Sequence, residues 1–144
     1  MTVVWRICRR PFADLSGKGA RLYGGRWNSP GRPLIYTAEA AALAVLEVRV
    51  HLDLDWDTLP DDYVLVSIDL GALVPEAIAN LPADPRAMGD AWLRSGRSAL
   101  LRVPSQIVPE SHNVLINPAH ADASSITIGS IRSFAFDRRL WLPD

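Results

Sequence analysis

A glycine-flanked arginine is the first feature that could do chemistry. In Gly24-Gly25-Arg26-Trp27-Asn28, the two glycines let the backbone take positive φ and approach a ligand closely. An arginine held in such a turn can present its planar guanidinium to a pyrophosphate. Tyr36 ends the next short apolar run, where its ring can stack on a flat heterocycle. A β-turn with a surface arginine and two core aromatic residues explains the same segment, so both interpretations stay open.

Glu47 is the second such feature. It lies beside the apolar stripe of an alanine-rich segment, where a carboxylate is costly unless it is paired or used. His51, four residues on, shares its helix face. Glu47 either pairs with a buried arginine or stabilises positive charge that develops on a sugar carbon.

Ser105 and Asn117 stand at the two ends of a third segment. Ser105 follows Pro104, so it takes an extended or turn conformation from which its hydroxyl can point into a cleft. Asn117 precedes Pro118 and is typical of a turn. Taken alone, each residue is better explained by a structural role.

Other chemistries lack their sequence signatures. The chain has no phosphate-binding loop, dinucleotide fingerprint, zinc-protease motif, paired cysteines or nucleophile elbow. His51, His112 and His120 are too dispersed for a metal site, so no metal is expected. The single cysteine, Cys8, lies in an apolar run and is interpreted as a buried small hydrophobic residue.

Composition narrows the class of protein. A net charge of −1 gives no bulk attraction to nucleic acid, which argues against an mRNA-cleaving enzyme. No apolar stretch is long enough to cross a bilayer, and no secretory leader is evident. We therefore expect a cytoplasmic protein with no membrane contact.

The hydrophobic pattern along the chain predicts one α+β domain over residues 1–144, with few helices to position these residues. Residues 9–28 are expected to be mostly loop. Thr37 is expected to cap a helix that has Glu39 in its first turn and ends near Leu52. A second helix is expected over 86–96, and a half-buried strand over 63–70. The other expected strands are 3–8, 33–36, 98–103, 107–108, 114–116, 126–128 and 134–136.

Taken in order, these blocks resemble the RES domain, a family named for an arginine, a glutamate and a serine. The resemblance runs from Trp5 to Leu140, and Trp5 and Val114 stand where the family leads us to expect tyrosine or another aromatic residue. The matching blocks are Trp5-Arg6-Ile7, Gly19-Ala20, Gly24-Gly25-Arg26-Trp27-Asn28, Ile35-Tyr36, Leu46-Glu47-Val48, Leu101-Arg102-Val103-Pro104-Ser105, residues 113–118 with His120, and Phe136-Asp137-Arg138-Arg139-Leu140.

The resemblance implies a fold related to mono-ADP-ribosyltransferases such as diphtheria toxin, with a split β-sheet that grips NAD⁺. The matched site residues are Arg26 on the pyrophosphate, Tyr36 stacked on nicotinamide or its ribose, and Glu47 on the ribose. Ser105 would bond the nicotinamide ribose or orient Glu47. Two further residues, Arg21 and His51, would support this set.

The resemblance also implies the toxin of a type II toxin–antitoxin pair. Its antitoxin would carry an Xre-like helix-turn-helix domain, block the cleft and provide the only link to DNA. The toxin would cleave NAD⁺ at the nicotinamide–ribose bond, through a cationic transition state like that of glycoside cleavage, and transfer ADP-ribose to a protein. An NAD⁺ glycohydrolase or phosphorylase is the alternative, followed by a non-catalytic nucleotide-binding module or an inert interaction protein.

Overall fold

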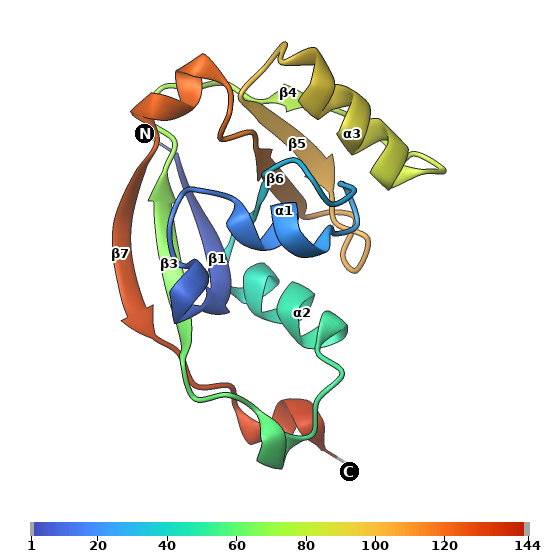
Figure 1. Ribbon diagram of the computed structural model, residues 1–144. Helices are drawn as coiled ribbons and strands as arrows, with labels where there is room; N and C mark the ends of the chain where they lie inside the picture. The colour runs from blue at the N-terminus through green and yellow to red at the C-terminus, as the bar shows by residue number, and fades with distance from the viewer. Residues whose placement is uncertain (1, 143–144) are drawn as a thin grey trace.

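Seven strands form one mixed sheet in the order β4-β5-β6-β2-β1-β3-β7. The computed structural model describes residues 2–142 (Figure 1). The strands are β1 (Val3–Arg9), β2 (Ile35–Ala38), β3 (Tyr63–Asp69), β4 (Glu76–Ala77), β5 (Leu100–Pro104), β6 (His112–Ile116) and β7 (Thr127–Ser133). The helices are α1 (Lys18–Tyr23), α2 (Ala41–His51) and α3 (Pro85–Ser95), with short 3-10 turns at Arg10–Phe12, Trp56–Thr58, Ala121–Ser125 and Arg138–Trp141.

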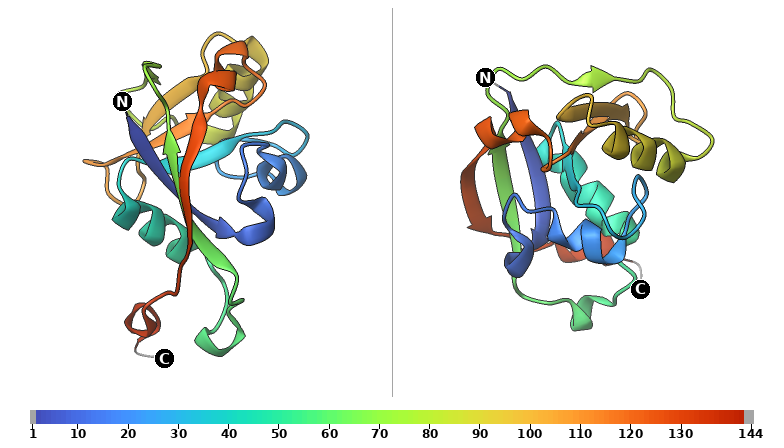
Figure 2. Two further views of the ribbon diagram at one scale, coloured as in Figure 1. Left: turned by 90° about the vertical axis from the view of Figure 1, so that its left-hand side faces the viewer. Right: turned by 45° about the horizontal axis from the view of Figure 1, so that its top comes forward.

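The sheet is divided at the boundary between β1 and β2. These two strands pair only where Trp5 lies opposite Ala38, whereas β1 pairs with β3 along its whole length. One wing therefore contains β7, β3 and β1, and the other contains β2, β6, β5 and β4. Helices α1 and α2 lie on opposite sides of β1 (Figure 2, left). The expected α+β fold with a split sheet and few helices is confirmed.

Helix α2 covers the division between the wings. Leu43 and Ala44 of α2 are buried in one cluster with Ile7 of β1 and Ala38 of β2. Both strands are thus held against the same helix face, and the division stays open only beyond this contact. The helix is where the sequence predicts it, but it begins later.

The expected helix cap at Thr37 is wrong. Thr37 continues β2, pairs with Val114 of β6 and donates its hydroxyl to the Val114 carbonyl at 2.7 Å. The helix begins at Ala41, and its N-cap, Ala40, makes no side-chain hydrogen bond to the first turn. Glu39 therefore lies outside the helix. Strand pairing with a distant segment outweighed the local capping preference.

Residues 9–28 are more ordered than the expected loop. Besides the 3-10 turn at Arg10–Phe12, they contain α1, which is bracketed by Gly17 (φ 69°) and Gly24 (φ 71°). These glycines supply the left-handed backbone at the helix ends. The glycine-rich composition thus marks helix boundaries here rather than continuous loop.

Four of the predicted strands need correction. Strand β3 is buried rather than half-buried, because β1 and β7 flank it and its two faces pack into two different core clusters. Residues 107–108 and 134–136 are not strands. The strand expected at 126–128 extends from 127 to 133, since it pairs with β3 along that length.

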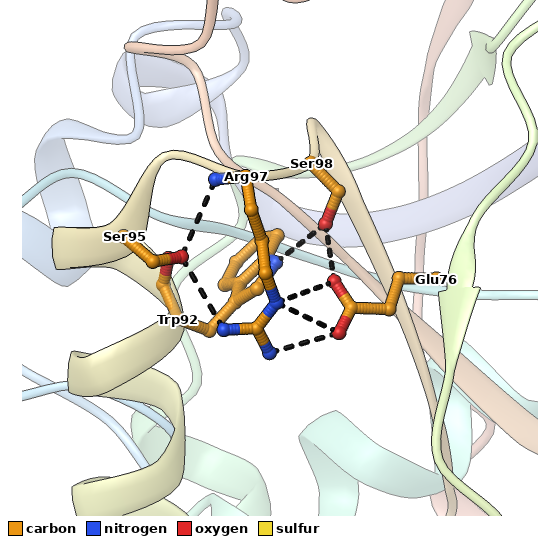
Figure 3. A network of polar contacts seen from close by, with 5 residues as sticks. All are labelled: Glu76, Trp92, Ser95, Arg97 and Ser98. Carbon is orange, nitrogen blue, oxygen red and sulfur yellow. Dashed lines mark hydrogen bonds and ion pairs between the residues drawn. The ribbon is translucent and has the colours of Figure 1, made fainter.

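Helix α3 packs on the wing that contains β5 and β6 and is fixed at its C-terminal end. Trp92 is fully buried against Trp27 and the apolar side chains of β5 and β6. Its indole nitrogen donates to Ser98 at 2.8 Å, and the Ser98 hydroxyl donates to Glu76 of β4 at 2.6 Å. Arg97 also pairs with Glu76 at 2.8 Å (Figure 3). These bonds fix α3 relative to the sheet edge.

Candidate active site

A cavity of about 520 Å³ opens where β1 and β2 diverge. One wall is β1, a second is β2, a third is α2, and the fourth is the segment from Gly19 to Trp27. This volume lies within the range of small-molecule sites, which are mostly apolar with a few placed polar groups. The polar side chains at the cavity include Arg6, Arg26, Tyr36, Glu47 and His51.

Arg26 lies in a tight turn whose ends are joined by a hydrogen bond from the Gly25 amide to the Asn28 carbonyl at 2.9 Å. Its side chain lines the cavity. Within residues 2–142, the Arg26 Nε atom is buried and has no hydrogen-bond partner. A buried guanidinium donor without an acceptor is costly. The site therefore fits an anionic ligand that accepts from Arg26.

Tyr36 uses its hydroxyl to hold this turn. The oxygen accepts from the Trp27 amide at 2.9 Å and donates to Asn28 Oδ1 at 2.6 Å. A Cβ on Gly25 would lie 2.5 Å from that oxygen, so the turn requires glycine there. Burial raises the pKa of Tyr36 to about 12. The hydroxyl is thus a neutral donor at physiological pH, while the ring contributes to the cavity wall.

Glu47 projects from α2 and is bonded from behind by Ser105. The Ser105 hydroxyl donates to Glu47 Oε1 at 2.7 Å, and Ser105 is fully buried. The Ser105 hydroxyl oxygen also accepts from the amides of Ile107 and Val108, at 3.1 and 3.2 Å. Because these amides occupy the lone pairs, the hydroxyl proton is directed to Glu47.

Of the two alternatives for Glu47, pairing with a buried arginine is not found within residues 2–142. Ser105 is the hydrogen-bond partner of its carboxylate there, and Glu47 makes no salt bridge with those residues. Glu47 lines the cavity, whereas Ser105 is not among the lining residues. The structure therefore places Glu47 at the cavity and Ser105 behind it.

His51 and Arg21, the two residues expected to support the site, lie in different places. His51 lies one turn after Glu47, is exposed and lines the cavity. Arg21 is exposed on α1 and is not among the residues that line the cavity. Asn117 accepts from the Ala119 amide at 3.1 Å, which confirms its place in a turn. It contributes nothing to the cavity wall.

Two polar residues at the cavity were not assigned a role from the sequence. Arg6 of β1 lines it and donates to the Phe12 carbonyl at 2.8 Å. Asn113 of β6 lines it and donates to the Thr37 carbonyl at 3.2 Å. A charged residue within the otherwise apolar stretch Val3–Cys8 was the available signal for Arg6. No local signal distinguished Asn113 from other strand residues.

A nucleophilic cysteine and a metal centre are two other classes of site. Cys8 is half-buried rather than buried: it packs against the core and also lines the cavity. Burial raises the pKa of its thiol, which disfavours the thiolate that a nucleophile needs. Within residues 2–142, no group of three or more His, Cys, Asp or Glu side chains is placed to hold a metal ion. No helix in that range has the length and apolar character needed to span a membrane.

Comparison with known proteins gives consistent matches along the chain. The model of the RES domain matches residues 3–137. A protein named "Prs ADP-ribosylating toxin" from Sphingobium sp. (strain YBL2) is 42% identical, over 96% of each chain. A protein named "Toxin Res" from Pseudomonas putida is 38% identical, over 96% of this chain and 99% of the relative.

A solved structure supports the fold independently. The toxin–antitoxin complex MbcT–MbcA of M. tuberculosis contains a chain that superposes with a TM-score of 0.73 over 92% of this chain and 84% of that chain. At 20% sequence identity, this likeness concerns the fold alone. The family match covers nearly all of the described residues, and relatives above 30% identity align end to end. The chain belongs to the RES domain family.

Proposed function

We propose that this protein is the toxin of a toxin–antitoxin pair, an enzyme that cleaves NAD⁺ and transfers ADP-ribose to a cellular protein. One observation carries the proposal. A buried arginine nitrogen without a protein partner and a carboxylate fixed by a buried serine line one cavity of about 520 Å³. The curated relatives named as toxins, one of them as ADP-ribosylating, supply the class of reaction.

Arg26 fits the pyrophosphate of NAD⁺. A phosphate oxygen in the cavity would accept from the Arg26 guanidinium, which lines the wall and makes no salt bridge within residues 2–142, and guanidinium–phosphate bonds are among the strongest in proteins. The Tyr36 ring lies in the cavity wall near this arginine's turn. There it would pack on the nicotinamide or its ribose.

Glu47 fits the ribose from which nicotinamide departs. The bond between the nicotinamide nitrogen and the ribose carbon breaks, and its electron pair stays with nicotinamide. Positive charge then develops on the ribose, and a carboxylate already oriented by Ser105 stabilises it. A nucleophilic group of the acceptor forms the new bond to that carbon and loses its proton. His51 lines the same wall and would support this set.

The antitoxin is proposed to carry a helix-turn-helix domain and to cover this cavity. Leu22 and Tyr23 of α1 are 45% and 76% exposed, and Tyr23 lies on the cavity rim. Such exposed apolar side chains beside the opening fit a partner that seals it. The neighbouring fold is itself known from a toxin–antitoxin complex. Contact with DNA would come through the antitoxin, in the bacterial cytoplasm.

The test uses purified protein without antitoxin, NAD⁺ labelled in its adenylate part, and a lysate. Release of nicotinamide with label on a protein band supports the transferase. Release with label only in small molecules replaces it by a hydrolase or, if the product depends on added phosphate, a phosphorylase. If the wild-type protein releases no more nicotinamide than the Glu47→Gln control, the proposal is contradicted. A toxic phenotype that persists in Glu47→Gln would contradict it in cells.

A further inference from the structure

Helix α3 lies directly behind the turn that carries Arg26, on the side away from the cavity. None of the residues of α3, all of which the structure describes, lines the cavity. Arg86, Gly89 and Asp90 are spaced so that they share one helix face, and each contacts residues 25–29. The helix thus contacts the turn without lining the cavity.

Asp90 makes the strongest of these contacts. One carboxylate oxygen accepts from the Ser29 amide at 2.8 Å, and the other accepts from the Ser29 hydroxyl at 2.6 Å. Desolvation acts to raise the pKa of Asp90, but the hydrogen bonds from Ser29 prevail and lower it. Asp90 is therefore ionised at neutral pH, and both hydrogen bonds are charge-assisted.

Gly89 and Arg86 hold the other end of the turn. A Cβ on Gly89 would lie 1.7 Å from the Trp27 carbonyl oxygen, so the helix backbone packs directly on the turn backbone. The Arg86 guanidinium donates to the Gly25 carbonyl at 3.2 and 3.3 Å. Arg26 is therefore flanked on both sides by residues whose backbone α3 contacts.

The turn has a second support from the cavity side. The fully buried Asn28 donates to the Ala20 carbonyl at 2.9 Å and accepts from Tyr36. Asn28 also donates to the Ser29 carbonyl at 3.2 Å, whereas the Ser29 amide and hydroxyl bond to Asp90. Loss of the Asp90 contact would thus loosen the C-terminal side of the turn while leaving the Asn28 and Tyr36 bonds in place.

We propose that Asp90, with Arg86 and Gly89 beside it, is a positioning residue that holds the Arg26 turn in the geometry that binds the pyrophosphate of NAD⁺. This inference rests on the proposed function. Arg26 would contact the pyrophosphate in both the ground state and the transition state. Its displacement should therefore raise KM and leave kcat nearly unchanged.

The experiment compares steady-state NAD⁺ cleavage by wild type, Asp90→Ala, Asp90→Asn and Ser29→Ala. A hydrogen bond to a charged group corresponds to about tenfold or more in an equilibrium constant. We expect KM to rise about tenfold in Asp90→Ala, with kcat within about twofold. Asp90→Asn keeps an acceptor for the Ser29 amide and should recover most of the loss. Ser29→Ala removes only the hydroxyl contact, so its effect should be smaller than that of Asp90→Ala.

Asp84→Ala is the matched control. Asp84 caps α3 by accepting from the Ala87 amide at 3.0 Å and does not contact the Arg26 turn. Its loss should destabilise the start of the helix but keep both Asp90–Ser29 bonds, so KM should rise clearly less than in Asp90→Ala. A double-mutant cycle with Arg26→Ala adds a second criterion. If Asp90 acts through Arg26, Asp90→Ala should have no further effect on KM once Arg26 is removed.

Amide hydrogen exchange over residues 25–29 separates this inference from the proposed function. Exchange should be faster in Asp90→Ala than in wild type or Asp84→Ala, whether or not the protein turns over NAD⁺. An inactive wild type with this exchange pattern would contradict the proposed function only. Unchanged exchange, an unchanged KM in folded Asp90→Ala protein, or additive effects with Arg26→Ala would overturn the positioning role.

Discussion

Ser105 and Glu47 are joined by a 2.7 Å hydrogen bond between residues 58 positions apart in the chain. The serine lies after β5 and the glutamate within α2. Because two backbone amides occupy the other bonding positions of the serine oxygen, the bond fixes one orientation of the carboxylate. Ser105 thus acts on Glu47 rather than on the cavity that Glu47 lines.

This relationship predicts that Ser105→Ala lowers kcat for NAD⁺ cleavage by about 10- to 100-fold, because small displacements of a reacting group are costly. KM should change little. The measurement is nicotinamide release at saturating NAD⁺, with Gln106→Ala, an exposed neighbour, as the control. An unchanged kcat in the folded Ser105→Ala protein would contradict the orienting role.

Glu47→Gln should be more severe than Ser105→Ala. The substitution retains the size of the side chain but removes the charge that stabilises the cationic ribose. We expect kcat to fall by about 10²- to 10³-fold, the range for loss of one preorganised electrostatic group. NAD⁺ affinity, measured by calorimetry on the same variant, should stay within a few-fold. A variant with wild-type turnover would show that the carboxylate takes no part in the reaction.

Arg26→Ala and Arg21→Ala should behave differently, although the two arginines are five residues apart in the sequence. Arg26 lines the cavity with an unpaired buried Nε, so its removal should raise KM for NAD⁺ by tenfold or more, in line with about 1.5 to 3 kcal/mol for a charged hydrogen bond. Arg21 is exposed away from the cavity wall, so its removal should leave KM within about twofold. Equal effects of the two substitutions on KM would contradict this assignment.

Tyr36 should contribute a measurable pH dependence to stability. Its pKa is raised to about 12 by burial, whereas an unfolded tyrosine ionises near pH 10. Between these values the unfolded state binds fewer protons than the folded state, so the free energy of unfolding falls as pH rises. Urea unfolding at pH 9 to 11.5 should show this decline, and it should be smaller in Tyr36→Phe. Identical slopes would contradict the assignment.

Gly89→Ala should destabilise the protein through a backbone clash. The new Cβ would meet the Trp27 carbonyl oxygen at 1.7 Å, and such overpacking typically costs about 1–3 kcal/mol. Gly96→Ala is the comparison, since Gly96 has φ +59° but open space around it, and this conformation costs alanine roughly 1–2 kcal/mol. Thermal unfolding of both variants tests this. A Gly89→Ala protein as stable as wild type would show that α3 does not lie this close to the turn.

The sequence by itself determined the elements whose signal is local. Strands β1 and β3, the body of α2, and α3 follow from hydrophobic periodicity, because a side chain's burial in these elements depends on its position in the repeat. The family resemblance selected Arg26, Tyr36, Glu47 and Ser105 together. Neither source fixed the contacts between them.

Tertiary structure decided the rest, because its causes lie far apart in the chain. Pairing with β6 kept Thr37 in a strand, against its preference for a helix cap. The three-dimensional arrangement turned the Tyr36 hydroxyl toward the Arg26 turn and placed Ser105 behind Glu47. It also brought Asp90 to Ser29 over 61 residues. Hydrogen bonds of this kind depend on the packing of whole elements, which local periodicity and turn preferences do not specify.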